Sequence, residues 1–160
     1  EEYDSHWERR DILGVHKQKQ EGHNWVGLCV PAGRMSAQDC IDAAELAERY
    51  GDGNLRLTVD QNIIFPNIKD VDVEAFLAEP LCAKFPSNPG NLSRGLVSCT
   101  GSQFCGFGMV ETKNRAIHVA AELEKQLDIP RMVRFNWTGC PNSCGQAQVG
   151  DIGLMGAAAK

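Results

Sequence analysis

Four cysteines, arranged as two close pairs, are the residues of this chain with the clearest capacity for chemistry. Cys99 and Cys105 lie in the segment CTGSQFC with five residues between them, and Cys140 and Cys144 lie in TGCPNSC with three between them. Four thiolates form the ligand set of a [4Fe–4S] cluster. The neighbouring Gly, Pro, Ser and Asn residues favour tight loops that can wrap around such a group.

The same four thiols leave other interpretations open. Structural zinc is disfavoured because its paired cysteines are usually separated by roughly two to four residues. Disulfides are disfavoured because the seven cysteines are an odd number and cannot all pair within one chain. Buried free thiols are a further alternative for the two pairs. The isolated Cys29, Cys40 and Cys82 lie in or beside apolar segments, so we expect each of them to be a small core residue.

Composition limits the possible partners. The 160 residues carry a formal charge of −5, which does not support nucleic-acid binding because such domains are typically basic. No apolar run approaches the length that spans a bilayer, so membrane insertion is not expected. The chain begins without Met and ends at residues 156–160 without an evident closing element, and we therefore expect it to be an internal segment of a longer protein.

The elements that must position the cysteines divide the chain into three parts. Residues 1–24 are polar and charged, and we expect them to form a surface segment. Residues 25–84 predict a small α+β half-domain, ferredoxin-like in topology, in the order β-α-β-β-α. Its strands are expected at 25–31, 55–60 and 63–65, where Pro66 closes the last one. Its helices are expected at 36–50, with Ser36 as N-cap, and at 70–80, ended by Pro80.

Residues 85–160 predict a second α+β unit that carries both cysteine pairs. The turn-forming residues 85–95 are interpreted as a linker or loop. A strand at 95–99, a long helix at 110–127 and a strand at 133–137 should follow, with a last, bent strand at 149–154. Both cysteine pairs then follow strands, on loops that a rigid scaffold holds in place.

The two cysteine segments carry a resemblance to a known family. CTGSQFCG, followed by NWTGCPNSCGQAQVGDIGLMG, is similar to the sirohaem- and [4Fe–4S]-containing nitrite and sulfite reductases. The upstream segments LGVHKQKQEG, VGLCVPAGRMSAQD and LRLTVDQNIIFPNI extend the resemblance over most of the chain. In detail it resembles the ferredoxin–nitrite reductases of plants and algae. It implies a ferredoxin-like half-domain over 25–84 and a truncated sirohaem and [4Fe–4S] domain over 85–160.

The resemblance also implies roles for the cysteines. Cys99, Cys105 and Cys140 would hold three irons of the cluster. Cys144 would hold the fourth and bridge to the sirohaem iron as its axial ligand, so that electrons pass directly between the two centres. Nitrite would bind at the open face of the haem and be reduced by six electrons to ammonium, with ferredoxin as donor. The expected location is the chloroplast stroma, or the cytoplasm in a prokaryote.

The cations and amides around the haem are less specific predictions. Sirohaem carries eight carboxylates, and Arg34, Arg56 and Arg94 are candidates for contacting them from this side. Asn142 could donate a hydrogen bond to sulfur or haem. The resemblance implies a family built from two repeats, of which this chain matches the second. No catalytic residue is assigned within this segment, because the cations that family members use at the substrate lie mostly in the first repeat. The segment alone is expected to be inactive. A sulfite reductase and a non-catalytic metal or electron-transfer module are the alternatives.

Overall fold

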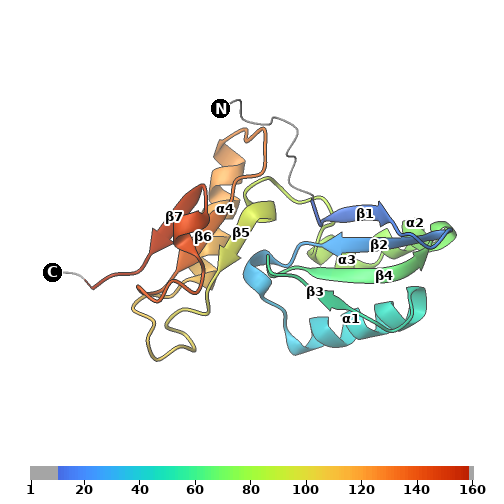
Figure 1. Cartoon of the computed structure of the whole chain (residues 1–160), viewed down its shortest axis with the longest axis horizontal. Helices are drawn as coiled ribbons and strands as arrows, with labels where there is room; N and C mark the ends of the chain where they lie inside the picture. Colours follow the sequence, from blue (N-terminus) through green and yellow to red (C-terminus); the bar gives the residue numbers. More distant parts are fainter. Residues whose placement is uncertain (1–10, 159–160) are drawn as a thin grey trace.

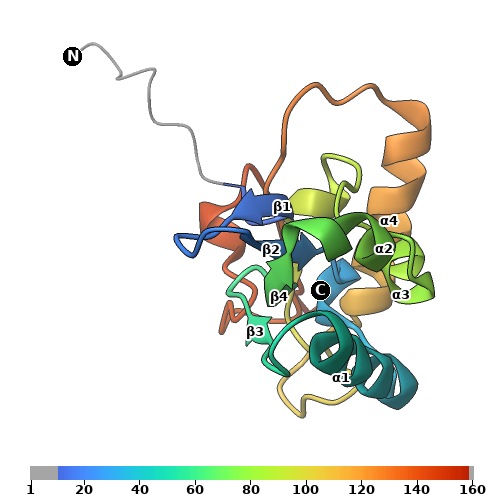
Figure 2. The ribbon, with the colours of Figure 1, turned by 90° about the vertical axis from the view of Figure 1, so that its right-hand side faces the viewer.

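Two sheets, one antiparallel and one parallel, organise the part of the chain that the computed structural model describes, residues 11–158 (Figure 1). The antiparallel sheet has the strand order β1-β2-β4-β3. Three helices lie on one side of it, as Figure 2 shows. The strands are β1 (Gly14–Lys17), β2 (His23–Leu28), β3 (Arg56–Leu57) and β4 (Ile63–Lys69), and the helices are α1 (Ala37–Tyr50), α2 (Val73–Leu77) and α3 (Pro80–Lys84).

Helix α1 begins and ends where its sequence indicates. The Ser36 hydroxyl accepts a hydrogen bond from the Asp39 backbone N–H at 3.2 Å, and the Asp39 carboxylate accepts one from the Ser36 N–H at 2.8 Å. This reciprocal capping box satisfies two N–H groups that a helix start leaves unpaired. At the other end, the Gly51 N–H donates to the Ala47 carbonyl at 3.0 Å. The prediction of a helix capped by Ser36 is confirmed.

The structure corrects several expectations for the first half. The surface segment expected for residues 1–24 contains a strand that was not predicted, because β1 pairs with β2 at the edge of the sheet; residues 1–10 lie outside the described residues. The half-buried strand at 55–60 is reduced to the two exposed residues of β3. Strand β4 continues through Pro66, which is tolerated because a bulge puts it where the ladder needs no N–H. Pro80 begins α3 instead of ending α2.

Apolar side chains between the antiparallel sheet and its helices form the first core. Phe65 of β4 and Phe76 of α2 are almost fully buried, with ring centroids 5.0 Å apart. Val26 and Leu28 of β2 reach the same cluster, as do Ala43, Leu46 and Ala47 of α1. The helices therefore cover the face of the sheet that alternation predicts to be apolar.

The second sheet is parallel, in the order β5-β6-β7. Its strands are β5 (Leu96–Ser98), β6 (Phe135–Thr138) and β7 (Ile152–Met155), and helix α4 (Lys113–Gln126) connects the first two. Short 3-10 helices precede β5 and β7, at Ser93–Gly95 and Ala147–Val149. The latter replaces the start of the predicted bent strand. None of the helices within residues 11–158 is long and apolar enough to cross a membrane.

A short 3-10 helix at Pro31–Gly33, labelled η1, joins the two halves. Its central residue, Ala32, is fully buried in the second core, among Leu92, Leu96, Ala116 and Phe135. Ala32 has a φ of 50°, a left-handed conformation that is uncommon for a residue with a side chain. The first half thus inserts part of its backbone into the core of the second, next to β5 and α4.

Candidate metal centre

The four paired cysteines come together at one edge of the parallel sheet. Cys99 directly follows β5, and Cys140 comes two residues after β6. Because β5 and β6 are parallel, their carboxyl ends lie at the same edge, and both loops start there. Cys99, Cys105, Cys140 and Cys144 line a single cavity of about 440 Å³, together with Phe104, Phe107, Asn142 and several glycines.

Backbone hydrogen bonds tie the two cysteine loops to each other. The Met109 N–H, in the first loop, donates to the Gly139 carbonyl in the second at 2.8 Å. In the opposite sense, the Gly139 N–H donates to the Cys99 sulfur at 3.1 Å. The loops are therefore held as one unit around the cavity, and one thiol already accepts the kind of N–H contact that tunes cluster sulfurs.

Cys99 is poised to act as a thiolate ligand. Burial raises the pKa of its thiol, but hydrogen bonds from the Gly139 and Gly101 N–H groups, and hydrogen bonds with the Thr112 and Thr138 side chains, outweigh burial and lower it overall. Donors of this kind stabilise the charged sulfur. A metal ligand must be deprotonated, so this environment favours metal binding over an inert buried thiol.

Glycines allow the close approach of the loops at two positions. Gly101 has a φ of 72°, and a Cβ there would lie 2.5 Å from the Thr112 Oγ1. A Cβ on Gly145, the residue after Cys144, would lie 2.2 Å from the Trp137 carbonyl oxygen. Real Cβ atoms do not approach other atoms this closely, so the path of both loops requires glycine at these positions.

A buried amide on β6 shapes the end of the second loop. The Asn136 side chain is 1% exposed, and its Nδ2 donates to the carbonyls of Gly145 and Gln146 at 2.9 and 3.1 Å. Gln146 has a left-handed φ of 53°, which turns the chain back toward β7 after Cys144. Within this loop Cys140 is buried and Cys144 is exposed, so the two thiols face different environments.

The arrangement fits a group larger than one ion. Among residues 11–158, no three His, Cys, Asp or Glu side chains lie close enough together to hold a single metal ion. Four thiols around one tetrahedral zinc would lie about 3.8 Å from each other. The described thiols instead surround a cavity, which is the arrangement that a multi-iron cluster needs.

The other predicted site residues are dispersed. Asn142 lines the cysteine cavity. Arg34 lies beside the first cysteine loop, where its guanidinium donates to the side-chain oxygens of Gln103 and Asn114. Arg56, on β3, borders a separate hollow of about 540 Å³. The structure does not bring Arg56 to the cysteines.

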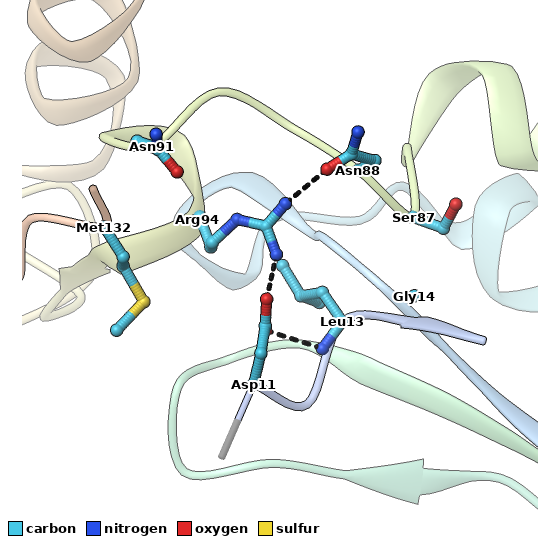
Figure 3. A pocket seen from close by; sticks show the side chains of 8 residues that line it. All are labelled: Asp11, Leu13, Gly14, Ser87, Asn88, Asn91, Arg94 and Met132. Carbon is cyan, nitrogen blue, oxygen red and sulfur yellow. Dashed lines mark hydrogen bonds and ion pairs between the residues drawn. The ribbon is translucent and has the colours of Figure 1, made fainter. Parts of the chain in front are cut away.

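Arg94 lines a separate hollow, before the start of β5 (Figure 3). It precedes β5, whereas Cys99 follows that strand, so the length of the strand separates the two. Its guanidinium donates to the Asp11 carboxylate and, at 2.5 Å, to the Asn88 Oδ1, in a hollow of about 530 Å³. Arg94 therefore ties the segment before β1 to the loop before β5.

The three isolated cysteines behave differently from one another. Cys29 and Cys82 are buried, and their thiols donate to the Ser93 and Phe76 carbonyls. Burial raises the pKa of each to about 11, as expected of core thiols. The prediction is wrong for Cys40, which lies on the exposed face of α1.

Sequence reasoning missed most of the residues that the fold packs around Ser98 and Cys99, of which Thr138 also lines the cavity. Thr112 and Thr138 contribute hydroxyls to Cys99, and Thr138 immediately precedes the glycine and cysteine of the TGC segment. The Lys113 ammonium donates to the Ser98 carbonyl, directly before Cys99. The Gln61 side chain, from the first half of the chain, also donates to the Ser98 carbonyl. No periodicity marks these residues, because their role depends on contacts between distant segments.

Comparison with known proteins adds family information. Residues 16–81 match the model of the nitrite/sulfite reductase ferredoxin-like half domain, and residues 89–160 match the nitrite and sulphite reductase 4Fe-4S domain. The predicted fold class, a ferredoxin-like half-domain followed by an α+β cluster-binding domain, is confirmed.

Three relatives illustrate the similarity. The chloroplastic ferredoxin–nitrite reductase of Oryza sativa subsp. japonica is 58% identical over 157 residues, 98% of this chain and 26% of the rice protein. The ferredoxin–nitrite reductase of Synechococcus elongatus is 60% identical over 151 residues, 94% of this chain and 30% of that protein. The solved structure of the Mycobacterium tuberculosis NirA protein superposes with a TM-score of 0.86 at 34% identity, over 96% of this chain and 29% of that one. The chain thus spans less than a third of each relative's length.

Proposed function

The chain belongs to the nitrite and sulfite reductase family, and on that premise we propose that it is the cluster-bearing part of a ferredoxin-dependent nitrite reductase. The observation that carries this proposal is the cavity lined by all four paired cysteines. The names of the similar plant and cyanobacterial proteins favour nitrite as substrate and ferredoxin as electron donor. The proposed reaction consumes nitrite, eight protons and six electrons, and yields ammonium and two water molecules.

The four thiols would together bind the cluster, and one of them would also bind sirohaem. Cys99, Cys105, Cys140 and Cys144 would each bind one iron of the cluster, and the N–H and hydroxyl groups around Cys99 would stabilise its charge. Cys144 suits the additional role of bridging to sirohaem, because it is exposed while Cys140, in the same loop, is buried. Asn142, beside it in the cavity, can donate a hydrogen bond to a sulfur or to the haem. The bound sirohaem would supply the iron at which nitrite is reduced.

Ferredoxin would deliver the electrons one at a time. Phe104 and Phe107, both exposed in this chain, line the cysteine cavity with apolar surface. Side chains of this kind can exclude water from a cluster and thereby influence its potential.

We propose the chloroplast stroma as the location, by analogy with the chloroplastic relatives; cyanobacterial relatives make the cytoplasm of a prokaryote the alternative.

The proposal is best tested in a complete enzyme. In what we call the chimera, this chain replaces the matching 151 residues of the Synechococcus elongatus relative. We expect about five irons and four acid-labile sulfides per chain, from one cluster and one sirohaem. Cys144→Ser should abolish nitrite turnover with reduced ferredoxin, whereas Cys40→Ser, outside the cavity, should leave it unchanged. Turnover of Cys144→Ser at the level of Cys40→Ser would refute the bridging role.

The same chimera separates the alternative functions. One zinc per chain without sulfide would support a structural metal module and contradict the proposal. Comparison of turnover with nitrite and with sulfite measures substrate preference directly, since the family includes reductases of both anions. We expect nitrite to be the faster substrate, and faster turnover of sulfite would reassign the enzyme within the family.

A further inference from the structure

Lys113, the first residue of α4, places a cation directly behind the first cysteine loop. Its half-buried ammonium donates to the Ser98 carbonyl at 3.2 Å and to the Ala32 carbonyl of η1. Within residues 11–158 it forms no ion pair with a carboxylate. Two carbonyl dipoles therefore stabilise the ammonium, and among the described residues no carboxylate pairs with it.

The position of this cation relative to Cys99 is fixed by a clamp on Ser98. Ser98 is fully buried, and its backbone pairs with the Gln61 side chain: the Gln61 Nε2 donates to the Ser98 carbonyl at 2.8 Å, and the Ser98 N–H donates to the Gln61 Oε1 at 3.1 Å. The residue before the cysteine is thus held by Gln61 and Lys113 together. The neighbouring Thr112 hydroxyl donates to the Cys99 carbonyl at 2.6 Å.

A second cation lies on the same side of the loop. The Arg34 guanidinium donates to Gln103, between the first two cysteines, and to Asn114 at the start of α4. Burial and then the Arg34 charge lower the pKa of Lys113, while the Cys99 thiolate raises it. The charge of Lys113 and the charge on the sulfur therefore interact through the protein.

We propose that Lys113, with Arg34 beside it, raises the reduction potential of the [4Fe–4S] cluster by holding positive charge against the first cysteine loop. This inference rests on the proposed function, because it requires the cluster at Cys99. Reduction adds one negative charge to the cluster, and a fixed, partly desolvated cation stabilises the reduced state relative to the oxidised one. Lys113 is a positioning and tuning residue in this role, and its effect is to make electron acceptance from a one-electron donor more favourable.

The test is a redox titration of the chimera, followed by electron paramagnetic resonance of the reduced cluster. The step measured is addition of one electron from dithionite to the oxidised cluster, with no covalent bond formed or broken. For Lys113→Gln we expect the ratio of reduced to oxidised cluster at a fixed solution potential to fall about tenfold, equivalent to about 59 mV for one electron. Lys113→Arg keeps the charge and should stay within about twofold of the parent.

A matched control removes the same charge from the same helix. Lys125 is exposed in the last turn of α4, about 18 Å along the helix from Lys113, and pairs with Glu122 at 2.7 Å. Because water and salt screen a distant exposed charge, Lys125→Gln should leave the ratio unchanged. An equal shift in the Lys113 and Lys125 variants, or no shift in Lys113→Gln with its cluster intact, would overturn the inference.

A second variant covers the case in which Lys113→Gln does not retain iron. Asn114→Asp keeps the size of a side chain that is exposed and accepts a hydrogen bond from Arg34. Its added negative charge opposes both cations, so the ratio should fall in the same direction but by less. An unchanged ratio contradicts the inference. If the unmodified chimera contains no cluster at all, the proposed function fails first, and the iron and sulfide content reports that outcome separately.

Discussion

Gly101→Ala tests whether the backbone of the first cysteine loop determines cluster binding. Gly101 has a φ of 72°, and this left-handed conformation costs a residue with a Cβ about 1–2 kcal/mol. The new Cβ would also lie 2.5 Å from the Oγ1 and 2.8 Å from the backbone nitrogen of Thr112. Moving Thr112 would disturb its hydrogen bond to the Cys99 carbonyl, which contributes about 1 kcal/mol. We therefore expect a loss of about 2–3 kcal/mol in the free energy of unfolding.

Gly106→Ala is the matched control within the same loop. A Cβ on Gly106 meets no atom within 4 Å, and its φ is not in the left-handed region. Its effect on stability should stay within about 0.5 kcal/mol. Urea unfolding of the 160-residue chain, followed by circular dichroism, measures the stability, and iron content of the chimera measures cluster assembly. If Gly101→Ala matches Gly106→Ala in both measurements, the reasoning about this loop is wrong.

Three further predictions address the second cysteine loop, the first core and the stability of the chain at acid pH. Asn136→Leu should lower the free energy of unfolding by about 2 kcal/mol in the same urea assay, because the Gly145 and Gln146 carbonyls lose their buried donor. The control is Gln126→Leu, at an exposed position, and an equally small effect of Asn136→Leu would contradict this prediction. Cys82→Ser should leave the iron content of the chimera unchanged, since the thiol lies in the core of the first half, and loss of iron would show that a ligand had been misassigned. A hydrogen bond from Lys84 and, to a lesser extent, hydrogen bonds from Ser36 lower the pKa of Asp39 to about 2. The ionised Asp39 carboxylate therefore stabilises the fold above its ordinary pKa near 4, and this contribution is lost as the pH falls from about 4 to about 2. Asp39→Asn should flatten the stability of the chain across that pH window, and an unchanged acid profile would count against the Lys84 interaction.

Much of the fold follows from local patterns. The capping box at Ser36 and Asp39 and the apolar spacing of α4 depend on residues within one element, so sequence alone located both helices. Predictions from local residue types were wrong where contacts with distant segments determine the structure. Pro66 continues a strand because a bulge accommodates it, and the polar residues from Gly14 onward join a sheet because β2 offers an edge.

The candidate site shows the same division. The types and spacing of the paired cysteines indicated a cluster, because ligand chemistry depends on residue type. The surroundings of each thiol could not be predicted, since Thr112 approaches Cys99 across the first loop and Gln61 binds the preceding residue, Ser98, from the other half. Arg94 is a candidate contact for the haem carboxylates in the sequence, and only the fold shows that it pairs with Asp11.

By itself, the sequence identified the four thiols that we predict to bind iron and the two loops that carry them, because thiols, turn formers and strand patterns are encoded locally. Only the tertiary structure decided that both loops leave the same edge of a parallel sheet, that Cys144 is exposed while Cys140 is buried, and that Lys113 binds the carbonyl of Ser98, the residue before Cys99. The physical reason is that burial and electrostatic interaction depend on distances through space. Those distances are fixed by packing between segments that lie far apart along the chain.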